Sequence, residues 1–313
     1  MPQLAAKLPE PDLKGGVFAL GNFDGVHQGH QSVVKIARDK ARGLGVPVRI
    51  LTLEPHPRSV FRPDIPPFRL TPAPAKIRLL QQLGVEDVIV TPFTLEFSQL
   101  PAEDFVEKIL MRSYGAQHVV AGSDFVFGNA RGGNMQNLRG WLAPHNVGVT
   151  EVTPFRDGQG IVMSSSRTRI ALQEGDLQTA AHILGRPWSI AGIIQHGDKR
   201  GRQLSVPTAN IALGEYLRPK FGVYAVMAGP VGKSLRHQGV ANIGSRPTVD
   251  GKNEILEFHL FNFEGDLYGQ EWEVELLHFL RPEQAFPDLD SLRAQIMQDI
   301  ETAKGRLAAA IIR

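Results

Sequence analysis

The sequence predicts two domains of different class: an α/β domain with a parallel sheet, then a small antiparallel β-barrel with a C-terminal helix. The first half alternates short apolar runs with segments of helical periodicity, which is typical of a parallel sheet with helices on both faces. The second half has strand-like runs separated by Gly, Pro, Asn and Asp, without helical segments between them. The change from the first pattern to the second occurs near Gly185, so the expected domains are residues 1–185 and 186–313.

Strands and helices alternate along the first expected domain. Apolar runs place strands at 17–20, 48–53 and 87–91, in a segment ending at 121, and at 149–152. Helical spacing marks 33–38, 75–80 and 105–110. Ligands of such sheets bind at the carboxyl ends of the strands. Polar residues that follow a strand are therefore candidate site residues, and His27, Glu54 and Asp124 meet this condition.

The second expected domain consists of short strands and one closing helix. The strands are expected at 188–194, 222–227, 238–243, 255–263 and 271–279. Short strands joined by turn residues favour a barrel. From Leu289 onward, apolar residues recur at helical intervals, which predicts a helix packed on the barrel.

Composition limits the possible functions. The chain has 313 residues, 42% hydrophobic and 21% charged, which is enough for two cores. No apolar run reaches the roughly 20 residues of a membrane helix and no signal-peptide core is present, so a cytoplasmic location is expected. The absence of cysteine excludes disulfides, thiolate zinc sites and cysteine nucleophiles. Because the net charge is +2 and basic residues are scattered, no nucleic-acid partner is expected.

A glycine-rich segment from Gly21 to His30 follows the first expected strand. A strand, a glycine turn and a helix start aim free backbone N–H groups at an anion, so the segment predicts a phosphate site. His27 and His30 are expected on one face of the first helical turn, and Gly29 would let a ligand approach the backbone. A metal site is the weaker interpretation, because Asp24 is the only local third ligand.

A second phosphate-handling signature, Pro207-Thr208-Ala209-Asn210, follows another glycine-rich stretch. The Thr208 hydroxyl and the Asn210 amide oxygen are hard ligands that suit Mg²⁺. Taken alone, this segment would more often be a turn with an Asn cap. Two unrelated phosphate signatures predict two reactions on one polypeptide.

The chain resembles the bacterial bifunctional riboflavin kinase/FAD synthetase family in six segments that span nearly its whole length. These segments are 21–30, 122–128, 164–169, 184–187, 207–210 and 239–248. The resemblance implies a Rossmann-like nucleotidyltransferase domain followed by a riboflavin kinase barrel. It also implies two Mg²⁺-assisted steps: riboflavin and ATP give FMN, then FMN and ATP give FAD and pyrophosphate. Both a monomer and a weak homo-oligomer are compatible with the sequence.

In the first domain the resemblance implies that His27 and His30 stabilise the transition state and the departing pyrophosphate. Further nucleotide-binding residues are Gly21, Asn22, Phe23, Asp24, Gly29, Ser164, Ser165, Ser166 and Arg167, of which Ser164 to Arg167 would hold the β- and γ-phosphates. Candidates for the flavin pocket are Asp124, Phe125, Phe127 and Arg131, and the last three could instead line the adenine pocket. Two alternatives stay open: the serines could only cap a helix, and the phenylalanines could only pack in the core.

In the second domain the resemblance assigns Glu257 as the base that accepts the proton of the ribityl hydroxyl, with Glu254 as the alternative. Thr208 and Asn210 would bind Mg²⁺, and Arg281 belongs to the flavin-proximal region. The nucleotide loop would contribute Gly197, Lys199, Gly201 and Arg202. One departure stands next to it: Ser205-Val206 replaces the family's Gly-Phe, and a β-branched residue tolerates fewer loop conformations.

Other functions fit the sequence less well. Class I aminoacyl-tRNA synthetases share the His-x-Gly-His element, but this chain lacks their lysine-rich signature and any recognisable tRNA-binding module. Gly232-Lys233-Ser234 resembles the end of a P-loop, yet the required upstream glycine is Met227, so a hairpin tip is expected. Two alternatives within the family stay open: an enzyme with only adenylyltransferase activity, and a non-catalytic regulator that binds flavin and nucleotide.

Overall fold

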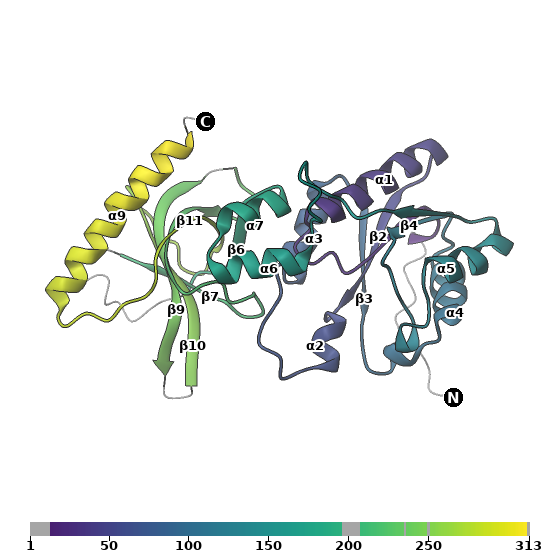
Figure 1. The fold of residues 1–313 in the computed structure, drawn as a ribbon, viewed down its shortest axis with the longest axis horizontal. Helices are drawn as coiled ribbons and strands as arrows, with labels where there is room; N and C mark the ends of the chain where they lie inside the picture. The colour runs from purple at the N-terminus through teal and green to yellow at the C-terminus, as the bar shows by residue number, and fades with distance from the viewer. Residues whose placement is uncertain (1–12, 196–206, 235, 249–250, 312–313) are drawn as a thin grey trace. The chain divides into compact units, whose positions relative to one another are not determined.

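The computed structural model describes residues 13–195, 207–234, 236–248 and 251–311. The chain divides into two compact units (Figure 1). The first unit comprises Met1–Pro66 and Thr71–Ser164, and the second comprises Pro67–Leu70 and Ser165–Arg313. Each unit has its own sheet and its own hydrophobic core.

A five-stranded parallel sheet forms the first unit, which confirms the predicted fold class. Its strands are β1 (Val17–Leu20), β2 (Val48–Glu54), β3 (Asp87–Pro92), β4 (His118–Gly122) and β5 (Gly148–Val152). The strand order is β3-β2-β1-β4-β5, so the order reverses between β1 and β4. Ligands of open α/β sheets bind at this switch point, outside the carboxyl ends of the strands. The glycine-rich segment begins where β1 ends.

Helices cover both faces of this sheet because successive residues of β1 point to opposite sides. Val17 and Ala19 pack with α1 and α3, whereas Phe18 and Leu20 pack with α5 and a π-helix. The helical elements are α1 (Gln28–Leu44), α2 (Pro57–Phe61), α3 (Ala73–Gln82), α4 (Ala102–Asp104), the π-helix (Phe105–Ser113) and α5 (Met135–Leu142). Short 3₁₀ turns occupy Phe97–Gln99, Asn129–Arg131 and Ala143–His145.

The second unit contains a six-stranded antiparallel sheet that curls into a nearly closed barrel. Its strands are β6 (Trp188–Ile193), β7 (Ala209–Ala212), β8 (Gly222–Pro230), β9 (His237–Thr248), β10 (Gly251–Leu260) and β11 (Glu271–Arg281). The order is β6-β11-β8-β9-β10-β7, and the two outer strands meet where Gln195 N–H donates to the Asn210 carbonyl at 2.9 Å. Strand β7 was not among the expected strands, and a turn was the interpretation of Pro207 to Asn210 when that segment is taken alone.

Among the residues that the structure describes, the helices of this unit are α6 (Ser165–Glu174), α7 (Leu177–Leu184) and α9 (Leu289–Ile311). The predicted C-terminal helix is confirmed as α9. Its Ile300, Ala303 and Leu307 pack against Val223 and Ala225 of β8, in a cluster separate from the barrel interior. A turn follows β8 at the expected hairpin tip, and β8 pairs antiparallel with β9.

Helices α6 and α7 belong to the second compact unit, although the sequence analysis assigned residues up to 185 to the first domain. Leu172 and Leu184 share one core with the barrel. Within the described residues, no strand lies between α6 and α7. The apolar periodicity of such helices shows that one face is buried, but it does not show in which of the two cores. The domain boundary after Gly185 therefore stays a prediction. The compact units of the structure are divided at another point, between Ser164 and Ser165.

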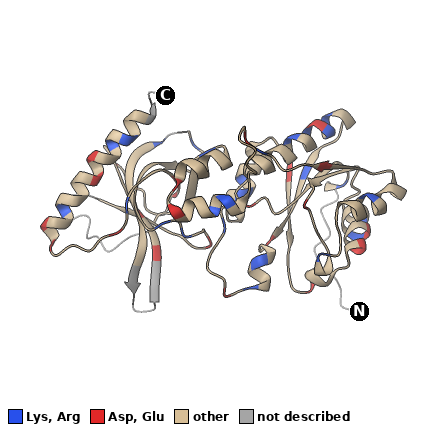
Figure 2. Cartoon of the chain, viewed as in Figure 1, with Lys and Arg blue, Asp and Glu red and all other residues tan. Residues whose placement is uncertain are grey.

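The distribution of charge agrees with the scattered basic residues of the sequence. Figure 2 shows Lys and Arg on helices of both units, interleaved with Asp and Glu. Among the residues that the structure describes, no helix combines the length and the apolar character needed to cross a membrane.

Candidate functional site

The glycine-rich segment forms a tight turn between β1 and α1. Phe23 and Val26 have positive φ angles of 51° and 44°, which residues with a Cβ atom rarely adopt. The buried Asp24 carboxylate accepts a hydrogen bond from the Thr71 N–H at 3.0 Å, and the Thr71 hydroxyl accepts one from Gly25 N–H at 2.8 Å. Asp24 therefore points into the protein and orders the turn.

The two predicted catalytic histidines lie together at the start of α1. His27 precedes the helix with an extended backbone, and its Nδ1 accepts a hydrogen bond from the backbone N–H of His30 at 3.3 Å. The imidazole rings stack with their centroids 3.6 Å apart. His27 thus caps the helix instead of lying on its first turn, because the first N–H groups of a helix need an acceptor from outside the helix.

Gly29 has a packing role between the histidines. A Cβ atom at this position would lie 3.0 Å from Cε1 of His27 and 3.3 Å from the Met163 carbonyl oxygen. A side chain here would therefore displace the His27 ring or the backbone of residue 163. Gly29 is expected from the sequence to let a ligand approach the backbone, and in the structure the space beside its Cα is occupied by the His27 ring and the Met163 carbonyl oxygen.

The predicted phosphate-binding serines stand where α6 begins. Helix α6 starts at Ser165, so Ser164 occupies the position before the helix. Ser164 ends the first compact unit, whereas Ser165, Ser166 and Arg167 belong to the second. Both earlier interpretations, a helix cap and a phosphate site, are compatible with a helix N-terminus. The assignment of β- and γ-phosphate contacts to these residues stays a prediction.

The predicted flavin residues of the first unit follow β4. Asp124 and Arg131 are exposed, and Arg131 has a positive φ of 59°. Phe127 is 8% exposed and packs against Phe105, with ring centroids 5.4 Å apart. Phe125 is half-buried and stacks on Phe127, again at 5.4 Å. Core packing therefore accounts for the position of Phe127, and the flavin roles of these residues stay predictions.

An aromatic cluster lies near the carboxyl ends of β2 and β3, and the sequence analysis did not single it out. The ring centroids of Phe61 and Phe93 are 5.6 Å apart, and those of Phe93 and Phe97 are 5.9 Å apart. Phe61, the last residue of α2, is 57% exposed. An exposed aromatic side chain at the ligand-binding edge of a sheet can stack on a flat ring. The available signal was Phe93, which stands two positions after the strand expected at 87–91.

The predicted kinase residues meet on neighbouring strands of the barrel. Glu257 on β10 stands directly opposite Asn210 on β7 in the antiparallel register. The Thr208 hydroxyl donates a hydrogen bond to Glu257 Oε1 at 2.7 Å. Asn210 is 5% exposed, and neither its Oδ1 nor its Nδ2 has a hydrogen-bond partner among the described residues. Strand pairing thus brings the Glu257 carboxylate to the hydroxyl of Thr208, 49 positions earlier in the sequence, and to the nearby buried amide of Asn210.

Glu254, the alternative base, faces another partner. Arg218 Nε lies 2.6 Å from Glu254 Oε2. An odd separation along a strand places Glu254 and Glu257 on opposite faces of β10. Glu257 is therefore the one that shares a face with Asn210.

Further polar side chains flank Glu257. Asn242 on β9 lies opposite Glu257 on the side away from Asn210, and Asn242 Nδ2 donates to Glu283 Oε1 at 3.1 Å. Asn242 stands in the segment 239–248 that resembles the family, and the sequence alone predicts no role for it. Arg281, the predicted flavin residue, forms a two-pronged ion pair with the buried Asp299 of α9, with Nη2 2.7 Å from Oδ2. Its contact with flavin stays a prediction.

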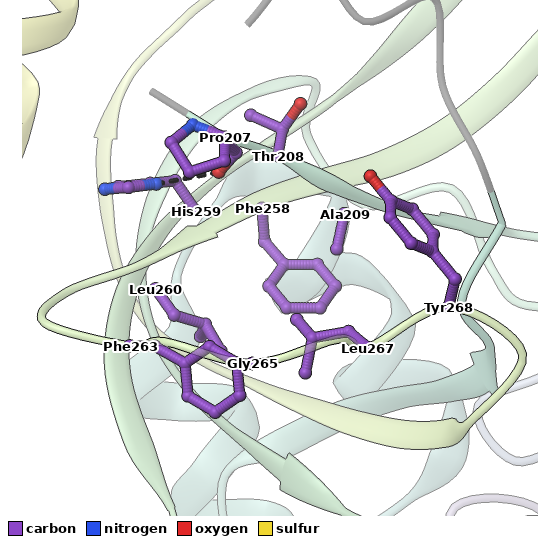
Figure 3. A pocket seen from close by; sticks show the side chains of 10 residues that line it. All are labelled: Pro207, Thr208, Ala209, Phe258, His259, Leu260, Phe263, Gly265, Leu267 and Tyr268. Atoms are coloured by element: carbon purple, nitrogen blue, oxygen red, sulfur yellow. Dashed lines mark hydrogen bonds between the residues drawn. The ribbon is translucent and has the colours of Figure 1, made fainter. Parts of the chain in front are cut away.

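A pocket of about 130 Å³ opens beside Thr208 (Figure 3). Its walls come from the start of β7, the end of β10 and the segment before β11, and Phe258, Leu267 and Tyr268 supply much of its apolar lining. At its edge, the His259 ring lies 2.8 Å from the Pro207 carbonyl oxygen. The predicted nucleotide-loop residues Gly197, Lys199, Gly201 and Arg202, and the departure at Ser205-Val206, lie outside the described residues.

Comparisons with known proteins cover both units. The FAD synthetase family model matches residues 10–167, and the riboflavin kinase family model matches residues 184–307. A relative from Haemophilus influenzae is 41% identical over 93% of this chain and 94% of its own length. A relative from Escherichia coli K12 is 37% identical over 95% and 94%. Both are named bifunctional riboflavin kinase/FMN adenylyltransferase.

A solved structure shares the fold of the whole chain. It comes from Streptococcus pneumoniae and is described as a macrolide-efflux protein. Its TM-score is 0.82 at 29% sequence identity, and the match covers 95% of this chain and 96% of that one. The two family models match in the order that the motifs predict, which confirms the resemblance. The chain belongs to the family of bifunctional riboflavin kinase/FMN adenylyltransferases.

Proposed function

We propose that the barrel phosphorylates riboflavin with ATP and that the parallel-sheet unit joins AMP from a second ATP to the FMN formed. The observation that carries this proposal is the group formed by Thr208, Asn210 and Glu257, in which a carboxylate lies beside a buried side-chain amide that has no hydrogen-bond partner among the described residues. The alternatives of a lone adenylyltransferase and of a non-catalytic regulator are not favoured, because both family models match and the relatives are named for both activities.

In the kinase step Glu257 accepts the proton of the ribityl hydroxyl as the hydroxyl oxygen attacks the γ-phosphorus of ATP and ADP leaves. The hydrogen bond from Thr208 fixes the orientation of the carboxylate. Thr208 engages Oε1 of Glu257, and we assign the acceptance of the ribityl proton to the same carboxylate group. Positioning of this kind, with charge stabilisation, supplies most of the catalysis in phosphoryl transfer.

The residues around Asn210 fit a magnesium ion. The Thr208 hydroxyl donates its proton in the hydrogen bond to Glu257, so the lone pairs of the Thr208 oxygen can bind a cation. The Asn210 amide oxygen is buried and has no hydrogen-bond donor among the described residues. Mg²⁺ prefers oxygen ligands and is usually held by few protein groups together with substrate phosphates. Bound there, the ion would neutralise charge that develops on the phosphates of ATP.

Asn210→Ala is expected to raise the Mg²⁺ concentration needed for half-maximal riboflavin phosphorylation by about 10- to 100-fold, because it removes a ligand oxygen. The measurement is an Mg²⁺ titration of FMN formation. FAD formation from supplied FMN serves as the control and should keep its Mg²⁺ dependence. An unchanged titration of the kinase step would remove Asn210 from the metal site.

In the adenylyl-transfer step a phosphate oxygen of FMN attacks the α-phosphorus of ATP, and pyrophosphate leaves. No protein nucleophile is required, so the protein contributes alignment and neutralisation of charge. The backbone N–H groups of the glycine-rich turn and the imidazoles of His27 and His30 are the groups that can align the phosphates and neutralise their charge.

The exposed Phe61 beside Phe93 offers a stacking surface for a flat ring. We assign this surface to the isoalloxazine of FMN.

The two activities are tested by a chromatographic time course with riboflavin, ATP and Mg²⁺ that separates riboflavin, FMN and FAD. FMN should appear first and FAD should follow. If riboflavin stays unchanged and FAD forms only from supplied FMN, the barrel has no kinase activity.

We place both reactions in the cytoplasm, carried out by a monomer or weak homo-oligomer without a nucleic-acid partner. Cell fractionation tests the location, and light scattering tests the oligomeric state.

A further inference from the structure

A buried lysine lies against the glycine-rich turn of the first unit. Lys76 on α3 is 0% exposed, and its Nζ lies 2.6 Å from Glu54 Oε1 at the end of β2. The same ammonium group donates to Thr52 Oγ1 at 2.9 Å and to the carbonyl oxygen of Asn22 at 3.2 Å. Lysine is almost never fully buried unless it is paired, because its charge is costly to remove from water. A purely structural position could be filled by an apolar residue at lower cost.

The turn that Lys76 contacts requires support from outside. The positive φ angles of Phe23 and Val26 are unfavourable, and such conformations persist only where surrounding contacts determine them. Thr71, five positions before Lys76, binds the turn at Asp24 and Gly25. Lys76 binds it at Asn22, so one short stretch of chain fixes both halves of the turn.

The contact at Asn22 also has an electrostatic effect. The Asn22 carbonyl and the Phe23 N–H are the two ends of one peptide group. A cation that binds the carbonyl polarises this group and strengthens its N–H as a donor. Within the described ranges, the N–H groups of Asn22 and Phe23 donate to no protein acceptor. A polarised N–H of this kind is a stronger donor to an anion that binds at the turn.

We propose that Lys76 is a positioning residue for adenylyl transfer: its buried ammonium group holds the Asn22 carbonyl and thereby fixes and polarises the glycine-rich turn that receives the phosphates of ATP. Glu54 and Thr52 hold the ammonium group in place. Lys76 acts through the turn and does not touch the reacting atoms. This inference rests on the proposed function of the first unit.

The test replaces Lys76 with methionine, which keeps the length of the side chain and removes its charge. Steady-state FAD formation is measured with ATP varied at saturating FMN, and then with FMN varied at saturating ATP. Lys76→Met should lower kcat/KM for ATP by about 10- to 100-fold, because small misplacements of a phosphate site have effects of this size. KM for FMN should change by less than about twofold, since the turn is not the flavin surface.

Removal of Lys76 leaves the Glu54 carboxylate without this partner, so a second variant separates the two effects. Lys76→Met/Glu54→Gln removes both charges, and the loss of kcat/KM for ATP should persist in it. Recovery of wild-type kinetics in this double variant would mean that Lys76 only neutralises Glu54, which overturns the proposal. Thr52→Val is a milder probe that removes a hydroxyl bonded to both Lys76 and Asn22. It should lower kcat/KM for ATP in the same direction even if the lysine variants do not fold.

Arg49→Met is the matched control. Arg49 is also a buried cation on β2, 5% exposed, with Nε 2.9 Å from Asp87 Oδ2. It lies near the beginning of the strand, away from the carboxyl edge. Arg49→Met should destabilise the unit yet leave kcat/KM for ATP close to wild type for the folded protein. An equal loss in this control, or an equal rise in KM for FMN in Lys76→Met, would overturn the positioning role.

Riboflavin phosphorylation by the same preparations provides an internal reference. It should be unchanged in Lys76→Met, and a parallel loss of both activities would overturn a local role for Lys76. Wild-type protein that makes no FAD from FMN would instead refute the proposed function of the first unit. Active wild-type protein with a fully active Lys76→Met variant would refute only the role of Lys76.

Discussion

His30→Ala is expected to abolish FAD formation from FMN while FMN formation from riboflavin continues. The imidazole of His30 stacks on that of His27 at the start of α1, where the helix N-terminus favours phosphate. Loss of a group that stabilises developing charge typically lowers kcat by roughly 10²- to 10³-fold. The backbone N–H of residue 30 remains in the variant, so the hydrogen bond to His27 Nδ1 and the start of the helix should persist. The loss can then be attributed to the imidazole.

The measurement is the rate of FAD formation from supplied FMN, with riboflavin phosphorylation recorded in parallel. His145→Ala is the matched control, because His145 lies elsewhere in the first unit with Nε2 2.7 Å from Glu107. That control should retain both activities. Retention of FAD synthesis by His30→Ala would exclude His30 from the reaction. Loss of both activities would argue against two independent sites.

Glu257→Gln should stop riboflavin phosphorylation and spare adenylylation of supplied FMN. Glutamine keeps the shape of the side chain and can still accept the hydrogen bond from Thr208, but it cannot accept the substrate proton. General-base catalysis contributes about 10²- to 10⁴-fold, so a loss of this size is expected in the rate of FMN formation. Because we propose a separate site for adenylyl transfer in the first unit, FAD formation from FMN should be unaffected.

The comparison with Glu254→Gln decides which glutamate is the base. Glu254 pairs with Arg218 on the other face of β10, so its replacement should affect stability more than phosphorylation. Both variants are assayed for FMN formation at equal concentrations of folded protein. If Glu254→Gln lost the kinase activity and Glu257→Gln kept it, the assignment would be reversed.

Much of the fold follows from local patterns in the sequence. The Val17–Leu20 run is fully apolar and becomes the central buried strand, and the helical periodicity after Leu289 becomes α9. Strand β7 was missed because Pro207 and Asn210 have turn propensity, while its partner β10 lies about fifty positions away. Pairing with a distant strand decided its conformation.

The candidate site was predictable to the extent that its residues stand in compact motifs. The glycine-rich segment, the two histidines and Pro207 to Asn210 could all be named from the sequence, since phosphate sites use short local arrangements. The aromatic ring of Phe61 and the lysine at position 76 could not be named. Nothing in their local pattern distinguishes an exposed stacking surface or a buried cation from an ordinary helix residue.

The sequence by itself determined the two fold classes, their order along the chain and the segments predicted to bind phosphate, because periodicity and motif spacing are local properties. Only the tertiary structure decided that Glu257 faces Asn210, that Glu254 faces away, and that His27 caps α1. It also decided that Lys76 is buried against the turn. These outcomes depend on strand register and on burial, which are fixed when distant segments pack together.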